Sequence, residues 1–261
     1  MALAFDSHGS GAPLVLLHGI GSRRGAWDPV VGALARERRA IVVDMPGFGG
    51  SSMEDVEPTA AGFTTRLERW FAEQGLGRPH VAGNSMGGGI ALELARRGTV
   101  ASATAIAPIG FWLPRELAFA QRSLRASRAV VTQLRPAVST LSRTAAGRTA
   151  LFSQVHARPW RVSPAEAVAT IDAFLDAPAF EPALEAFGAY RFRAGDELRG
   201  VPVTIAWGTR DALLLPRQAA RARRLLPWAR HVALHGCGHV PFHDDPEAVA
   251  AVLLAGSRET D

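Results

Sequence analysis

Short apolar runs alternate with longer segments of helical periodicity in the first part of this chain. The apolar runs are typical of strands buried on both faces of a sheet, and they occupy residues 3–6, 14–17, 40–44, 79–83 and 102–107. Between them, apolar residues recur at helical spacing, which predicts helices near residues 27–37, 59–75 and 86–97. This alternation indicates an α/β fold with a mostly parallel sheet and helices on both of its faces.

The strand pattern disappears between Pro108 and Arg193. This segment is rich in Ala, Leu, Arg and Phe at helical spacing, and it predicts four or five helices. We expect its prolines to punctuate these helices, at Pro114, Pro136, Pro159, Pro164, Pro178 and Pro182. Strands and helices then resume at residues 201–207, 216–226, 230–234 and 245–255. We therefore predict one core formed by residues 1–108 and 194–261, with residues 109–193 as a helical insertion.

Composition narrows the class of protein. A length of 261 residues suits one α/β domain, and the net charge of +5 comes from scattered arginines without interleaved aromatic residues. We therefore expect no nucleic-acid partner.

No apolar run reaches the roughly 18 residues that span a bilayer, and the first residues lack the pattern of a signal peptide. We expect a cytoplasmic protein with no membrane partner, and the oligomeric state stays open. Cys237, the single cysteine, is interpreted as a small buried residue instead of a redox-sensitive thiol.

The segment Gly83-Asn84-Ser85-Met86-Gly87 falls where a predicted strand meets a predicted helix. A serine on such a G-x-S-x-G turn is held in a strained conformation with its hydroxyl projecting, and the flanking glycines avoid collisions with neighbouring backbone. We predict that Ser85 is a nucleophile. Because a chance match to this motif is common in a glycine-rich chain, the rest of the site must be found elsewhere in the sequence.

Three further candidate groups follow predicted strands, in a chain order compatible with a Ser-His-Asp site. His18 follows residues 14–17, Asp211 follows residues 201–207, and His239 follows residues 230–234. Active sites gather at the carboxyl ends of parallel strands, so we expect these groups to converge on the serine. His239 is predicted to be the base, and Asp211 is predicted to orient its imidazole and stabilise the charged form.

These segments resemble the α/β-hydrolase superfamily over nearly the whole chain. The specific motifs are H-G-I-G at 18–21, D-M-P-G-F-G at 44–49, G-N-S-M-G-G at 83–88, W-G-T-R-D at 207–211 and G-C-G-H at 236–239. The resemblance implies the α/β-hydrolase fold, with the helical insertion as a cap. We also expect an oxyanion hole formed by the backbone amides of Ile20 and Met86.

Other histidines and acids compete for these roles. We expect His18 to order the backbone of its loop and His243 to be a capping or entrance residue. Asp44 comes too early in the chain order and is interpreted as structural. A metal site built on His239, His243 and the acids that follow is disfavoured, because Pro241 interrupts the helix that would align the two histidines. We therefore expect no metal and no organic cofactor.

The resemblance places a small-molecule substrate between the nucleophile and the cap. Candidate wall residues are Trp27, Phe111, Trp112, Trp160 and Phe242. An apolar wall indicates a small hydrophobic carboxylic ester that is cleaved through an acyl-enzyme. Two alternative reactions stay open. The G-N-S-M-G-G motif also resembles the meta-cleavage product hydrolases, which split carbon–carbon bonds, and cofactor-free perhydrolysis of the haloperoxidase type would use the same triad. A ligand-binding protein without turnover is a further alternative.

Overall fold

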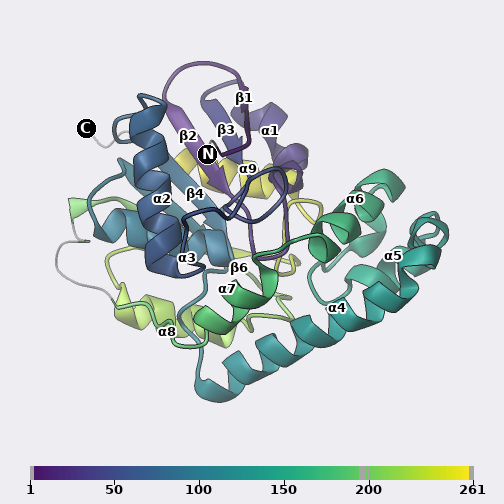
Figure 1. Cartoon of the computed structure of the whole chain (residues 1–261). Helices are drawn as coiled ribbons and strands as arrows, with labels where there is room; N and C mark the ends of the chain where they lie inside the picture. The colour runs from purple at the N-terminus through teal and green to yellow at the C-terminus, as the bar shows by residue number, and fades with distance from the viewer. Residues whose placement is uncertain (1–2, 194–197, 199, 259–261) are drawn as a thin grey trace.

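The structure, a computed structural model, describes residues 3–193, 198 and 200–258 (Figure 1). Its strands are β1 (Phe5–His8), β2 (Pro13–Leu17), β3 (Arg39–Val43), β4 (His80–Asn84), β5 (Ser102–Ile106), β6 (Val203–Gly208) and β7 (Arg230–Leu234). Its α-helices are α1 (Asp28–Leu34), α2 (Ala60–Glu73), α3 (Met86–Arg96), α4 (Pro114–Ser142), α5 (Ala145–Phe152), α6 (Pro164–Leu175), α7 (Phe180–Ala186), α8 (Arg217–Leu225) and α9 (Pro246–Gly256). The 3₁₀ helices η1 (Arg24–Trp27) and η2 (Pro159–Arg161) precede α1 and α6.

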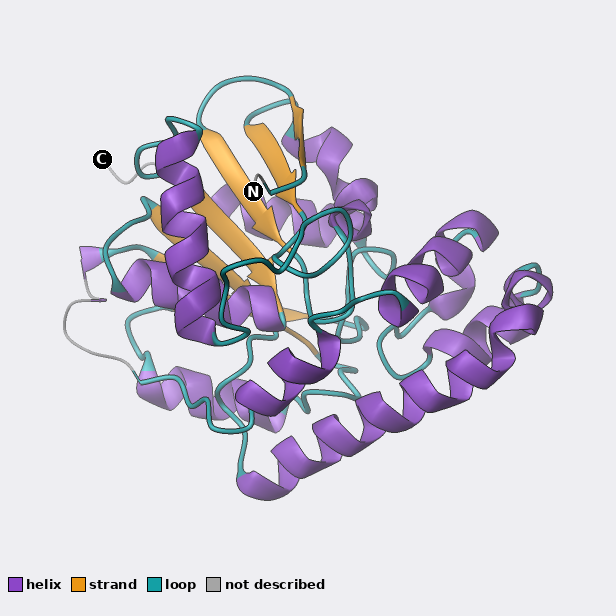
Figure 2. Ribbon diagram, viewed as in Figure 1, coloured by secondary structure: helices purple, strands orange, loops and turns teal. Residues whose placement is uncertain are grey.

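The strands form one sheet, coloured orange in Figure 2. Their order in the sheet is β1-β3-β2-β4-β5-β6-β7. Strand β1 pairs antiparallel with β3, and the other neighbouring strands pair in parallel. The predicted mostly parallel sheet is confirmed. Because the carboxyl ends of β2, β4, β6 and β7 lie at the same edge, the segments that follow these strands can meet there.

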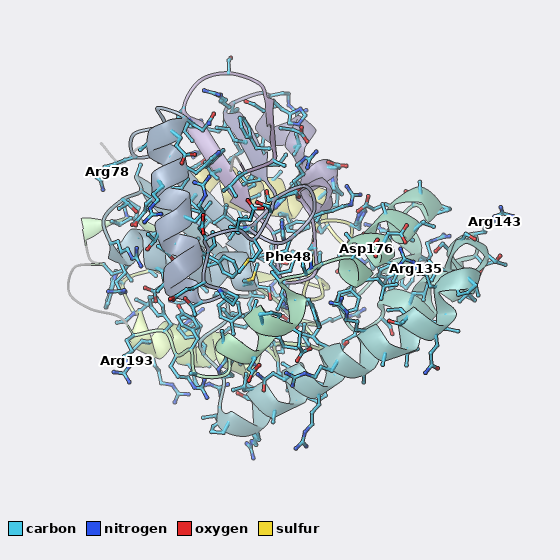
Figure 3. The ribbon with its side chains drawn as sticks, viewed as in Figure 1. Phe48, Arg78, Arg135, Arg143, Asp176 and Arg193 are labelled. Atoms are coloured by element: carbon cyan, nitrogen blue, oxygen red, sulfur yellow. The ribbon has the colours of Figure 1, made fainter. Side chains whose placement is uncertain are left out.

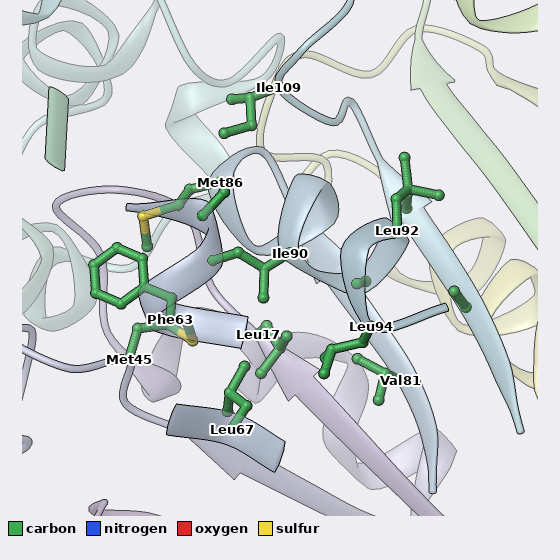
Figure 4. Packing of buried hydrophobic residues seen from close by; sticks show 14 of the residues in the cluster. Leu17, Met45, Phe63, Leu67, Val81, Met86, Ile90, Leu92, Leu94 and Ile109 are labelled. Atoms are coloured by element: carbon green, nitrogen blue, oxygen red, sulfur yellow. The ribbon is translucent and has the colours of Figure 1, made fainter. Parts of the chain in front are cut away.

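Successive side chains of the strands β2 to β6 enter two different cores, one on each face of the sheet. Leu17 packs with Phe63 of α2 and Ile90 of α3 in the first core, which Figure 4 shows from close by. Leu16 packs in the second core with Leu34 of α1 and Leu253 of α9. The period of two along a strand therefore explains why helices cover both faces.

The segment from α4 to α7, which we call the helical excursion, leaves the sheet after β5. Helices α4, α5 and α6 lie beside the sheet instead of on either face (Figure 1). They share a small core of their own, formed by Val131, Val138, Phe152, Val162, Ala167 and Ile171. Arg135 of α4 reaches Asp176 just after α6 at 3.0 Å, and both side chains are labelled in Figure 3. The predicted end of the insertion, between residues 193 and 194, borders residues outside the described part of the chain.

Helix α4 departs from the prediction that prolines punctuate the helices of the insertion. Pro136 lies inside this helix of 29 residues and does not end it. A proline here removes one backbone hydrogen bond, to the carbonyl of Thr132, but residues 132–136 are exposed to solvent, so water can bind the freed carbonyl. In the described part of the chain, no helix, α4 included, is both long and apolar enough to cross a bilayer.

Candidate active site

Ser85 occupies a strained turn between β4 and α3. Its backbone has φ 57° and ψ −113°, a region that non-glycine residues rarely adopt, and its N–H donates to the carbonyl of Ile106 at 2.9 Å. A Cβ atom at Gly83 would lie 2.1 Å from the carbonyl oxygen of Gly87, and one at Gly87 would lie 2.2 Å from that of Leu17. The turn therefore requires glycine at both positions of the motif.

Asp211 and His239 form a buried pair. The loop after β6 carries the acid and the loop after β7 carries the histidine, and the two side chains are 2% or less exposed. Nδ1 of His239 lies 2.8 Å from Oδ2 of Asp211. The other carboxylate oxygen accepts from the N–H groups of Leu213 and Leu214 at 2.9 and 2.8 Å. The carboxylate is thus held by its own loop in the orientation that meets the imidazole.

Ser85 and His239 line the same cavity. Because Nδ1 of His239 is engaged with Asp211, Nε2 is the nitrogen left for the serine hydroxyl. Among the described residues, Ser85 Oγ and His239 Nε2 make no hydrogen bond to each other; such contacts often tighten only when substrate binds. The segment between β7 and α9, which we call the histidine loop, is tied to the residue before Ser85, because the side-chain amide of Asn84 donates to the carbonyl of His239 at 3.0 Å.

The loop of residues 18–22 contains the predicted oxyanion donor Ile20, and we call it the oxyanion loop after that prediction. It lies directly against Ser85. A Cβ atom at Gly19 would be 3.2 Å from Cβ of Ser85. Nε2 of His18 accepts from the N–H of Met45 at 2.9 Å, so Nδ1 carries the proton and donates to the carbonyl of Gly19 at 2.7 Å. Burial lowers the pKa of His18 and keeps the ring neutral. These contacts give His18 an ordering role in the loop.

Two backbone N–H groups are available beside the serine. Ile20 lines the cavity, and Met86 is the first residue of α3. Within the described residues, neither N–H donates a hydrogen bond to a protein acceptor. The N-terminus of a helix carries a partial positive charge, so the Met86 end of α3 favours a developing anion.

Asp44 braces the chain that follows the oxyanion loop. It is buried, and its carboxylate accepts from the N–H groups of Arg24 and Gly50 at 2.6 and 2.8 Å and pairs with the guanidinium of Arg24. Arg23, the preceding residue, forms an ion pair with Glu166 of α6. Asp44 therefore has a structural role, since it holds the main chain at Arg24 and Gly50. The ion pair between Arg23 and Glu166 links the chain after the oxyanion loop to the helical excursion.

The cavity extends from Ser85 and the oxyanion loop into the space between α4, α5 and α6. Its volume is about 1070 Å³, the open mouth included. Its apolar wall is formed mainly by the excursion, at Leu124, Val131, Leu151, Phe152, Val155, Val162, Ile171 and Phe174, together with Phe242 from the core. Several of these residues also belong to the small core of the excursion. The cavity is thus a continuation of that core toward Ser85.

The wall departs from the sequence-based expectation at four aromatic positions. Trp27 is fully buried and packs against Phe242, with ring centroids 4.2 Å apart, outside the cavity wall. Phe111 and Trp112 are buried in the first core, and Trp160 is 50% exposed. These four residues do not line the cavity, because the aromatic positions in the sequence do not reveal which way a loop turns each ring. Phe242 does lie in the wall.

Sequence reasoning missed the polar residue His156, which lies in the wall next to His243. Their ring centroids are 5.7 Å apart. Burial lowers the pKa of His156 to about 4, and its Nδ1 atom has no hydrogen-bond partner among the described residues. A lone histidine in a helical segment offers no pattern by which the sequence could have marked it.

Cys237 is buried in the histidine loop. Burial raises the pKa of its thiol to about 11, and the nearby carboxylate of Asp244 acts in the same direction. A thiol with this pKa is not a reactive thiolate at neutral pH, which favours the space-filling interpretation. Within the described residues, no group of three or more His, Cys, Asp or Glu side chains is arranged to hold a metal ion.

Comparison with known proteins gives one family match, two relatives and one solved structure. The model of the alpha/beta hydrolase family matches residues 14–252. An uncharacterized protein of Mycobacterium tuberculosis is 28% identical over 264 residues, which cover 93% of this chain and 74% of the relative. The pimeloyl-[acyl-carrier protein] methyl ester esterase of Legionella pneumophila is 39% identical over 95 residues, 36% of each chain. Among solved structures, a thermophilic esterase from Thermogutta terrifontis has a TM-score of 0.71 at 23% identity, covering 97% of this chain and 92% of the other, and this likeness shows the fold.

Proposed function

The chain belongs to the alpha/beta hydrolase family and is a hydrolase, and from this premise we propose that it cleaves hydrophobic carboxylic esters through an acyl-enzyme on Ser85. The observation that carries the proposal is the buried contact of 2.8 Å between His239 Nδ1 and Asp211 Oδ2, in loops that bring the histidine to the cavity lined by Ser85. A neutral hydroxyl is a weak nucleophile, and this arrangement supplies the base and the acid that orients it.

The proposed reaction has two half-reactions, acylation of Ser85 and deacylation by water. Ser85 Oγ attacks the ester carbonyl while His239 Nε2 takes its proton, and Asp211 stabilises the imidazolium that forms. The N–H groups of Ile20 and Met86 receive the oxyanion, and each donor contributes about 3 kcal/mol to the transition state. The imidazolium then protonates the leaving alcohol. In the second half-reaction, His239 activates a water molecule that releases the acid and regenerates Ser85.

The cavity wall supports an apolar substrate. The side chains between α4, α5 and α6 that line the cavity are mostly aliphatic or aromatic, so an alkyl or aryl part of the ester gains free energy by leaving water there. The ester bond itself is supported by the Legionella relative, whose name describes a methyl ester esterase, over about a third of this chain. We propose the helical excursion as a cap over this site.

The proposal is tested with a chain-length series of p-nitrophenyl esters. Turnover by the wild type should fall about 10⁶-fold in Ser85→Ala, because an acyl-enzyme reaction depends on its nucleophile. Ser139→Ala is the matched control, since Ser139 is an exposed serine of α4 outside the cavity wall, and turnover should stay at the wild-type value. Absence of turnover in the wild type for every chain length would refute the ester proposal, and dienoic diketone substrates would then test carbon–carbon bond hydrolysis.

A further inference from the structure

Asp244 is a fully buried acid that joins two loops of the candidate site. It lies between β7 and α9, in the segment that follows His239, and is 0% exposed. Its Oδ2 atom accepts from the N–H groups of Gly238 and Ala157 at 2.7 and 3.0 Å, and its Oδ1 atom accepts from the N–H of Arg158 at 2.7 Å. Three backbone donors from two distant parts of the chain thus converge on one carboxylate.

The two joined loops are functionally distinct. Gly238 directly precedes His239, whereas Ala157 and Arg158 directly follow His156, whose ring lines the cavity. A second link lies alongside, because the N–H of Val240 donates to the carbonyl of Val155 at 2.8 Å. The approach is close: a Cβ atom at Gly238 would lie 2.7 Å from the nitrogen of Ala157. These contacts therefore fix the position of the loop that carries His239 relative to the helical excursion.

The contacts of Asp244 are not those of a residue that caps the helix α9. Asp245, the next residue, caps α9 by accepting from the N–H of Ala248 at 3.0 Å. Asp244 makes no such contact with α9. Instead, its own carbonyl accepts from the guanidinium groups of Arg158 and Arg161 at 2.9 and 2.7 Å. Main chain and side chain of Asp244 are both directed at the segment that follows α5.

We infer that Asp244 is a positioning residue, whose carboxylate fixes the main chain before His239 against the cavity wall at residues 155–158. This inference rests on the proposed function, since it presumes that His239 serves Ser85. A buried carboxylate with three N–H donors resists displacement, because moving it would leave the buried N–H of Gly238 and the partly buried N–H groups of Ala157 and Arg158 without their acceptor. The imidazole is thereby held at a constant place relative to the serine and to the bound substrate.

The test replaces Asp244 by Asn, which keeps the size of the side chain but substitutes an amide NH₂ for one acceptor oxygen. Either orientation of the amide faces at least one backbone N–H with another donor. We expect kcat for a p-nitrophenyl ester to fall about 10²-fold, the loss typical of a reacting group displaced by about 1 Å, with a much smaller change in KM. The rate at which a fluorophosphonate labels Ser85 should fall in parallel. Asp245→Asn is the matched control, since Asn also caps helices well and both rates should stay at wild-type values.

The outcomes separate the two proposals. Asp244→Asn protein that is folded by circular dichroism but labels and turns over like the wild type would overturn the positioning role and leave the proposed function intact. A wild type that fluorophosphonate does not label at Ser85 would overturn both. If Asp244→Asn does not fold, Asp244→Glu decides, because it keeps the charge but moves the carboxylate by one methylene in a fully buried place, so the three N–H donors cannot all keep their positions. A reduced kcat with unchanged KM then supports the role, and an unchanged kcat overturns it.

Discussion

Replacing Asp211 by Asn changes one proton position in the candidate site while keeping its shape. In the wild type, the N–H groups of Leu213 and Leu214 donate to Oδ1 of Asp211 at 2.9 and 2.8 Å. The amide oxygen of the Asn side chain can accept from the same two groups. The amide NH₂ then faces Nδ1 of His239 and donates to it. The proton of the neutral imidazole must therefore move to Nε2, which can no longer take the proton of Ser85. We expect kcat to fall about 10⁴-fold, equivalent to about 5 kcal/mol of transition-state stabilisation.

The assay is the release of p-nitrophenol under saturating ester, normalised to folded protein. Because Nε2 of His239 acts as the base in both half-reactions, the rate of any pre-steady-state burst should fall together with kcat. Asp172→Asn is the control, since Asp172 is an acid of α6 about half exposed and outside the cavity wall. An Asp211→Asn variant that retains more than about a tenth of wild-type kcat would refute the assignment of the proton to Nδ1.

Three further predictions concern the buried histidine, the serine turn and the cavity. Burial lowers the pKa of His156 to about 4, so the folded protein favours the neutral ring. The stability that this neutral ring contributes is fully present above pH 6.5, the ordinary pKa of histidine, and is lost as the pH falls through 4. This loss amounts to about 3 kcal/mol, and urea unfolding between pH 7 and 4 should be less pH-dependent in His156→Gln; an equal slope would contradict it. Gly87→Ala should lower the free energy of unfolding by about 3 kcal/mol, because its Cβ would meet the carbonyl of Leu17 at 2.2 Å, and unchanged urea unfolding would contradict that clash. Val131→Phe should lower kcat/KM for the octanoate ester about tenfold or more relative to the acetate, whereas Val130→Phe, at a residue 54% exposed, should not; equal effects would exclude the excursion as the acyl site.

The strands and the serine turn could be predicted because their causes are local. The apolar runs at β2 and β4 mark strands buried on both faces, and the predicted and observed boundaries differ by only one residue. Close backbone contacts require the two glycines of the turn, so the G-x-S-x-G motif is enough to predict a tight turn at Ser85. The seven strand segments and the chain order of Ser85, Asp211 and His239 follow from the same kind of evidence.

The helical excursion was less predictable, because its helices depend on packing and solvent. Prolines are weak boundary markers where a helix faces water, as Pro136 inside α4 shows. Likewise, the expected wall at Trp27, Phe111, Trp112 and Trp160 rested on residue type alone. An aromatic side chain is stabilised equally well in a core or in a cavity wall, so composition does not distinguish the two locations.

Local patterns in the sequence suffice to predict the parallel sheet, the serine turn and the strand ends at which the other groups lie, because periodicity and glycine requirements act over a few neighbouring residues. The tertiary structure alone decided which side chains of α4, α5 and α6 enclose the cavity. It also decided that Asp244 joins the segment after α5 to the histidine loop, through donors 86 and 87 residues away along the chain. Such contacts leave no periodic trace in the sequence, since they depend on how two loops approach one another once the sheet has formed.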